Sequence, residues 1–115
     1  MNMSPNFKRS EFACSCGCGF DTPDWELVEL LEKIRAQFAA PVKITSSCRC
    51  PAHNKAVGGK ASSQHLKGRA ADIQVKGVDP LEVQNYCASV GVRGLGSYST
   101  FTHVDTRATL AAWGG

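Results

Sequence analysis

Residues 63–72 read SQHLKGRAAD and join a long polar loop to a strand-like segment over residues 70–75. They place His65 and Asp72 seven residues apart across Gly68, whose missing side chain permits a sharp backbone turn. An aspartate among small and apolar residues is costly to bury unless it is paired or binds a cation. The stretch therefore predicts a loop-to-strand junction that presents two candidate metal ligands.

A third candidate ligand lies further along the chain, in residues 101–107, which read FTHVDTR. Because side chains alternate along a strand, His103 should point to the same side as Asp105. Two imidazoles and one carboxylate with an open fourth position describe a catalytic zinc site rather than a closed structural one. Such a zinc ion lowers the pKa of bound water to about 7 and polarises a carbonyl, as amide hydrolysis requires. The residues alone leave simpler interpretations open: a surface histidine at position 65 and an ordinary hydrogen-bonding aspartate at position 72.

The surrounding segments predict an α+β domain with two main helices. The first should be capped by Thr22 with Pro23 at its first position, and Trp25 should belong to the core. The apolar residues at helical spacing in this helix are Leu27, Leu30, Leu31, Ile34 and Phe38. The second helix should begin at a capping box over residues 79–82 and stop at Gly91. Its expected apolar positions are Leu81, Val83, Tyr86, Cys87 and Val90.

Strand-like segments lie between and after these helices, over residues 42–45, 70–75, 94–98 and 101–105. The last two segments predict a hairpin, and the lack of regular alternation with helices indicates a small, mainly antiparallel sheet. Residues 46–68 form a long Gly- and Ser-rich loop, with a helical turn near residues 51–56, and such long loops are usually functional. The segment to Phe20 should be loop-like, with one helical turn over residues 7–12.

Composition and charge place the chain among ordinary globular proteins. Its 115 residues suit one domain over residues 1–115, with 43% hydrophobic and 20% charged residues. The net charge of +3 is modest and its cations are scattered, which argues against a nucleic-acid partner. No apolar run approaches the roughly 20 residues of a membrane span, so we expect no membrane insertion. The first residues lack a secretory signal, so we expect synthesis in the cytoplasm. We also expect a monomer.

Six cysteines are many for this length. Five of them lie in two tight groups, Cys14, Cys16 and Cys18 in one and Cys48 and Cys50 in the other. Clustered cysteines in a cytosolic protein usually indicate metal, but this spacing differs from the familiar C-x2-C zinc knuckle. A structural metal site, a disulfide between the two groups and free thiols all stay open.

The pattern S-x-H-x-x-G-x-A-x-D over residues 63–72, followed later by His-Val-Asp at residues 103–105, resembles the M15 family of zinc peptidases. This family comprises D-alanyl-D-alanine carboxypeptidases and related phage and bacterial peptidoglycan peptidases, with the fold of the hedgehog signalling domain. The similarity runs from residues 4–7 through the first cysteine group to Trp113, and it looks closest to the short single-domain members common in phages and prophages. The resemblance implies a hedgehog/DD-peptidase-like fold and Zn²⁺ as cofactor.

The resemblance also implies roles for individual residues. The matching zinc ligands are His65, Asp72 and His103. Arg49 matches an arginine that helps bind substrate, and its planar, permanently charged fork suits a peptide carboxylate or carbonyl. Ser63 and Gln64 resemble positions that orient the site, and Gln64 also counts as an expected substrate-binding residue. Arg49 could instead pair with a surface acid, and Gln64 could be an ordinary loop residue.

One departure from the family pattern concerns the general base. Many members carry a glutamate shortly before the last histidine ligand, but residues 97–102 contain none, and the carboxypeptidase branch has a histidine where Phe101 stands. Asp105 is the best substitute, as the only carboxylate after Glu82. It could equally hold His103 by a hydrogen bond or pair with an arginine. His53 is a further candidate base, although a structural role in the loop competes with catalysis.

These observations predict a zinc peptidase that hydrolyses peptidoglycan stem-peptide bonds, of the D-Ala-D-Ala or L-Ala-D-Glu type. With no signal in its first residues, it would act on the wall after release through a separate membrane pore, or as a virion component. The missing glutamate motivates an alternative, a zinc-containing module that binds wall peptides without cleaving them. A weaker alternative is a cysteine–zinc module that binds nucleic acid in a strongly salt-dependent way.

Overall fold

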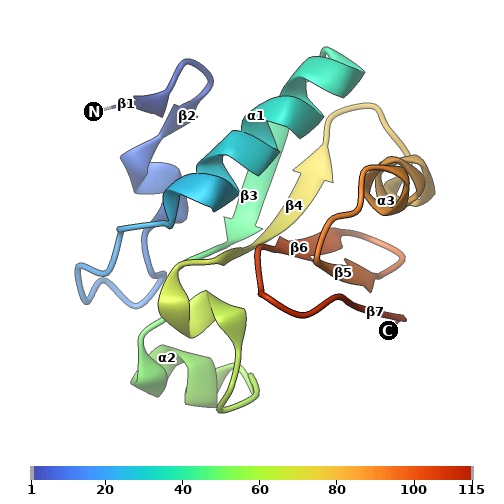
Figure 1. Ribbon diagram of the computed structural model, residues 1–115. Helices are drawn as coiled ribbons and strands as arrows, with labels where there is room; N and C mark the ends of the chain where they lie inside the picture. The colour runs from blue at the N-terminus through green and yellow to red at the C-terminus, as the bar shows by residue number, and fades with distance from the viewer. Residues whose placement is uncertain (1, 115) are drawn as a thin grey trace.

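The computed structural model describes residues 2–114. A five-stranded sheet lies at the centre of the molecule (Figure 1). The strands run in the order β3-β4-β6-β5-β7. Every neighbouring pair is antiparallel except β5 and β7, which are parallel. Their bounds are β3 (Val42–Ser46), β4 (Ala70–Val75), β5 (Gly94–Ser97), β6 (Thr102–Asp105) and β7 (Ala111–Gly114). The expected α+β class with a mainly antiparallel sheet is confirmed.

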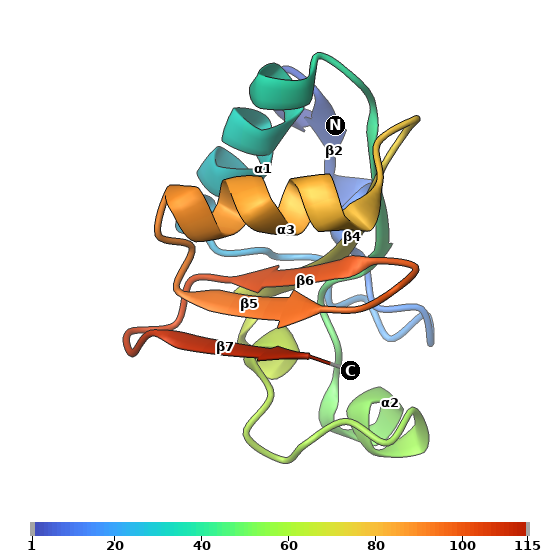
Figure 2. The same ribbon diagram turned by 90° about the vertical axis from the view of Figure 1, so that its right-hand side faces the viewer.

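Two helices cover one face of this sheet, α1 (Trp25–Phe38) and α3 (Pro80–Ser89), while the short α2 (Pro51–Ala56) lies on the other side (Figure 2). The core lies between the two helices and the sheet. Its central members are Leu27, Leu31, Ile34, Ile73, Val83, Cys87 and Val104. Fully burying one such aliphatic side chain contributes about 1.5–3 kcal/mol. The opposite face of the sheet is thereby left to polar side chains and to the loops around α2.

The start of α1 differs from the expectation. Its N-cap is Asp24 rather than Thr22, and the Asp24 carboxylate accepts a hydrogen bond from the backbone N–H of Glu26 at 3.2 Å. Pro23 therefore precedes the helix instead of occupying its first position. Trp25 is 57% exposed, so its assignment to the core was wrong. The apolar face begins two residues later, and the first helical residue points away from it.

The second expected helix, α3, is capped as expected, because the Asp79 carboxylate accepts from the N–H of Leu81 at 2.9 Å. Val83 and Cys87 are buried as expected, but Leu81 and Val90 are exposed, so their assignment to the apolar face was wrong. The helix is short, so only its central turn faces the sheet.

The N-terminal segment forms more regular structure than expected. It contains the expected helical turn, a 3₁₀ helix η1 (Arg9–Phe12), but also the small hairpin of β1 (Asn2–Ser4) and β2 (Phe7–Lys8). The strand β7 was not expected either. Among residues 2–114, no helix combines the length and apolar character needed to cross a bilayer.

Candidate metal centre

The register of the sheet aligns a row of residues across its polar face. Asp72 on β4 pairs directly with His103 on β6, and His103 pairs with Gly96 on β5. Directly opposed side chains on one face of a sheet have Cβ atoms about 4.5–5.5 Å apart. A Cβ at Gly96 would lie 2.9 Å from the Cβ of His103 and 2.8 Å from Nε1 of Trp113. The glycine therefore leaves the space that the His103 ring requires.

His65 reaches the same place from a different element, the 3₁₀ helix η2 (Gln64–Lys67). The hydroxyl of Ser63 caps this turn by accepting the backbone N–H of His65 at 3.2 Å. Gly68 ends the turn at φ +67°, and a Cβ there would lie 2.6 Å from the carbonyl oxygen of Thr22. The expected sharp turn at Gly68 is confirmed, and it directs the chain from η2 into β4.

The three side chains converge. Oδ1 of Asp72 lies 3.0 Å from Nδ1 of His103 and 3.4 Å from Nε2 of His65, and the ligand atoms of all three lie within 4.8 Å of one another. With zinc–nitrogen and zinc–oxygen bonds near 2.0–2.2 Å, two ligand atoms on one tetrahedral ion are about 3.3–3.5 Å apart. The donor set and its spacing therefore fit a single zinc ion.

Hydrogen bonds on the outer side of each imidazole fix which nitrogen faces the centre. Nδ1 of His65 lies 2.7 Å from the carbonyl oxygen of Ser47, which can only accept. Nε2 of His103 lies 2.7 Å from Oδ2 of Asp105. Each imidazole can thus keep its proton on the outer nitrogen and offer the lone pair of the inner nitrogen to a metal. Partners of this kind orient metal-bound histidines.

The electrostatics keep the carboxylate of Asp72 ionised. Burial alone would raise the pKa of Asp72, but hydrogen bonds from His103 and His65 outweigh it and hold that pKa well below its usual range. Burial would lower the pKa of His103, yet the carboxylates of Asp105 and Asp72 outweigh it and raise the pKa. The side chains of Asp72 and His103 keep 12% and 10% exposure, so solvent reaches the centre.

Asp105 lies behind His103, on the side away from Asp72. It is fully buried, where a Cβ at Gly94 would collide with its carboxylate. Oδ2 contacts Nε2 of His103 and accepts from Nη2 of Arg107, each at 2.7 Å, while Oδ1 accepts from Nε of Arg107 at 2.8 Å. Of the roles that the sequence left open for Asp105, this geometry favours holding His103 and pairing with Arg107 over proton transfer to substrate.

Arg49 lies beside the centre, as expected from the resemblance. Its Nη2 donates to Oδ2 of Asp72 at 3.4 Å, and its Nε donates to the hydroxyl of Ser46 at 3.1 Å. Nη1 is 3.4 Å from Oδ1 of the buried Asn54. The guanidinium is therefore held in place, and the Arg49 side chain keeps 15% exposure next to the carboxylate of a candidate ligand.

Gln64 lines a groove together with the cationic side chains of Lys67, Arg69 and Arg107. Gln64 adjoins His65 in the chain and Arg107 contacts Asp105, but none of the three candidate ligands lines this groove. His53 lies on α2, and it does not join the His65, Asp72 and His103 group.

Sequence reasoning missed two neighbours of the centre. The Ser47 carbonyl is a backbone acceptor, which leaves no signature in the residue type. Trp113 on β7 has its ring centroid 5.1 Å from that of His103, and its Nε1 donates to the hydroxyl of Tyr98 at 2.9 Å. A tryptophan following Leu-Ala-Ala near the end of the chain was the available signal for β7.

Comparison with known proteins agrees with this geometry. No curated protein matches the chain significantly. Residues 5–105, which include all three candidate ligands, match the protein family described as Peptidase M15. The match extends over most of the sheet and both main helices. This chain therefore belongs to the peptidase M15 family.

Proposed function

We propose that this M15 peptidase is zinc-dependent and hydrolyses stem-peptide bonds of peptidoglycan, of the D-Ala-D-Ala carboxypeptidase or L-Ala-D-Glu endopeptidase type. One observation carries the proposal: donor atoms of His65, Asp72 and His103 lie within 4.8 Å of one another on a solvent-accessible face. Three nitrogen and oxygen ligands with a free position are typical of catalytic zinc.

The protein residues have distinct tasks in this proposal. Bound zinc supplies Lewis-acid polarisation of a peptide carbonyl and acidifies water to a pKa of about 7. His65 and His103 hold their inner nitrogens toward the centre because Ser47 and Asp105 occupy the outer ones. Asp105, itself neutralised by Arg107, keeps His103 in that orientation.

Arg49 is the proposed anchor for substrate. A guanidinium offers a fixed fork of donors that matches a carboxylate, and Arg49 already lies next to the centre. The groove beside Gln64 adds the ammonium group of Lys67, whereas Arg69 pairs with Glu26 and Arg107 pairs with Asp105. Stem peptides carry carboxylates, so Arg49 beside the centre and Lys67 in the groove favour this substrate class over basic peptides.

The proton carrier that hydrolysis requires motivates a second candidate function. Residues 97–102 hold no carboxylate, and both oxygens of Asp105 are engaged in a fully buried position. A protein with the metal and the peptide groove but no proton carrier would bind wall peptides without cleaving them. In either case the target lies outside the cytoplasmic membrane, so we propose that the protein acts after release from the cell or as part of a virion.

The two candidates make opposite predictions for purified peptidoglycan. Zinc-loaded protein is incubated with wall fragments, the newly released amino groups are quantified, and the sedimented protein is measured in the same sample. Release by the wild type and not by His103→Ala supports the peptidase. Sedimentation with wall fragments and no released amines, with zinc demonstrably bound, rejects hydrolysis and supports the binding module. Neither release nor sedimentation rejects both.

A further inference from the structure

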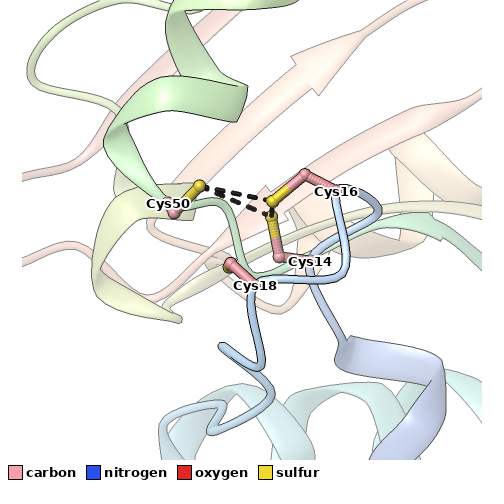
Figure 3. A group of neighbouring side chains, drawn as sticks. All are labelled: Cys14, Cys16, Cys18 and Cys50. Atoms are coloured by element: carbon pink, nitrogen blue, oxygen red, sulfur yellow. Dashed lines mark hydrogen bonds between the residues drawn. The ribbon is translucent and has the colours of Figure 1, made fainter.

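A second cluster of metal-type ligands lies outside the candidate centre and has no part in the proposed reaction. The thiols of Cys14, Cys16, Cys18 and Cys50 come together where the loop after η1 meets the segment before α2 (Figure 3). All four sulfur atoms lie within 4.8 Å of one another. Three come from a C-x-C-x-C stretch, and the fourth comes from a distant part of the chain.

The spacing of the sulfurs identifies what could hold them. The Cys14–Cys16, Cys16–Cys50 and Cys14–Cys50 Sγ distances are 3.4, 3.5 and 4.0 Å. Four thiolates on one zinc ion, with bonds of about 2.3 Å, have sulfurs about 3.8 Å apart along each edge of the tetrahedron. A disulfide would draw two sulfurs to about 2.05 Å and exclude the other two. The three separations lie around the edge length of a tetrathiolate zinc site, and the sulfur of Cys18 lies within 4.8 Å of the other three.

The backbone of the loop is folded so that these sulfurs meet. In an extended strand, alternate residues are about 6.6 Å apart, too far for three thiols to share one ion. Here Gly17, between Cys16 and Cys18, and Gly19, directly after Cys18, adopt φ +78° and +94°, which glycine reaches without steric cost, and they turn the chain there. The N–H of Gly17 donates to the carbonyl of Cys14 at 3.2 Å, and the N–H of Cys14 donates to the carbonyl of Phe20 at 2.8 Å. These hydrogen bonds close the loop around the cluster.

The fourth ligand is positioned independently. Cys50 is the N-cap of α2, and its sulfur accepts the backbone N–H of His53 at 3.4 Å. Donation from an N–H to a ligand sulfur stabilises the thiolate form that binds metal. The remaining cysteines behave differently, since Cys48 and Cys87 are buried in the hydrophobic core and belong to no such group.

We propose that Cys14, Cys16, Cys18 and Cys50 bind one structural Zn²⁺ ion, separate from the metal held by the His/Asp/His centre. Zinc is favoured because tetrahedral sites of four thiolates select it, and a site with four protein ligands leaves no position for substrate. On binding, the four thiols lose their protons to solvent and the metal takes their place. The proposal stands whichever peptide bond the protein cuts.

The location of this site assigns it a purpose. Cys50 directly follows Arg49, and the N–H of Arg49 donates to the carbonyl of His65 at 3.0 Å. The N–H of Cys48 donates to the carbonyl of Phe12 at 3.0 Å. A zinc ion on the four thiols would fasten the N-terminal loop to the segment that carries Arg49, and would hold that segment against η2.

The metal content of the full chain tests the proposal. Protein is purified from zinc-supplemented cells without chelators, and zinc per chain is measured by atomic emission. We expect two zinc ions in the wild type, one in the Cys16→Ser/Cys18→Ser variant and one in His103→Ala. Ser15→Ala, a change in the same loop that removes no thiol, is the matched control and should keep two. One zinc in the wild type, lost in His103→Ala and kept in the cysteine variant, would overturn the proposal.

Cobalt substitution in the wild type keeps the test decisive even where a cysteine variant fails to fold. Co²⁺ on four thiolates gives strong sulfur-to-metal charge-transfer absorption in the near ultraviolet, which a His/Asp/His site lacks. We expect this absorption to reach the strength of one tetrathiolate site per chain in the wild type, and to saturate at one cobalt ion per chain in His103→Ala. Its absence from cobalt-loaded protein, or a native disulfide among these four cysteines found by mass spectrometry, would contradict the proposed site.

Discussion

The two ligand clusters of this protein are built in opposite ways. His65, Asp72 and His103 project from a sheet and an adjoining turn, and each makes hydrogen bonds within the protein itself. The four clustered cysteines lie on loops, with one N–H from His53 as the backbone donor to Cys50. The first group is held in place by the fold, whereas in the proposed cysteine site a metal would hold the loops together. We infer that the first serves chemistry and the second serves stability.

The two clusters differ in how much conformational entropy is lost when their side chains are held in place. A sheet register fixes neighbouring side chains to within a fraction of an ångström, and this precision is what a catalytic metal requires. Loops cost conformational entropy to order, and a closed metal site can offset that cost because its binding energy is folding energy. Substitutions at the two clusters should therefore affect activity and stability to different degrees.

His103→Ala should have the largest effect. It removes one of three proposed ligands at the centre of the sheet, and loss of metal-derived stabilisation of several kcal/mol corresponds to about a 10³-fold fall in kcat/KM. The measurement is amine release from peptidoglycan together with metal content. His53→Ala is the control, because it removes the one histidine outside the centre and should retain activity within about threefold. A large loss in His53→Ala would instead restore His53 as a candidate base.

Asp105→Asn should weaken metal binding at the His/Asp/His centre by about 10–100-fold, because it removes the carboxylate that orients His103. Metal affinity is measured by competition with a chelator, and activity is measured again at saturating zinc. Saturating zinc should restore most of the activity if Asp105 acts only by positioning. A loss of about 10²–10⁴-fold in kcat that persists with zinc fully bound would identify Asp105 as the proton carrier.

Gly94→Ala tests independently whether Asp105 acts by positioning His103. The added Cβ would occupy the space of the Asp105 carboxylate without changing its charge. We expect it to weaken metal binding in the same direction as Asp105→Asn. Unchanged metal affinity in both variants would contradict the positioning role.

Arg49→Lys should lower kcat/KM by about tenfold with the metal content unchanged. Lysine keeps the charge but loses the fork, and one hydrogen bond to a charged group is worth about 1.5 kcal/mol. Steady-state kinetics on a soluble stem peptide measure the effect. Arg35→Lys, the same substitution on α1, should leave kcat/KM unchanged. An equal loss for a substrate whose carboxylates are amidated would show that Arg49 does not recognise a carboxylate.

Much of the candidate centre could be predicted from the sequence because strand alternation places His103 and Asp105 on one face, as found. The strand register that pairs Asp72 with His103 could not be predicted, because it depends on pairing between strands far apart in the chain. The contact from His65 to the Ser47 carbonyl was likewise hidden, because every residue carries a carbonyl. Trp25 was misassigned because helical periodicity alone does not locate the helix start, which the Asp24 cap determines. The cysteines left three interpretations open because spacing does not specify where a loop folds back.

Cys18→Ser should have the smallest effect on activity and a large effect on stability. If the four thiols bind zinc, replacing one weakens that binding, and a hundredfold weaker affinity removes about 2.7 kcal/mol of folding free energy at saturating metal. For a chain of this size that corresponds to a fall in Tm of roughly 10 °C. Arg49 keeps its contacts with Ser46 and Asp72, so kcat/KM measured well below Tm should change by less than about threefold. Thermal unfolding with and without zinc, beside Ser15→Ala as control, measures the difference. A large fall in kcat/KM at unchanged Tm would reverse the assignment of roles, and would mean that the cysteine cluster shapes the reaction rather than the fold.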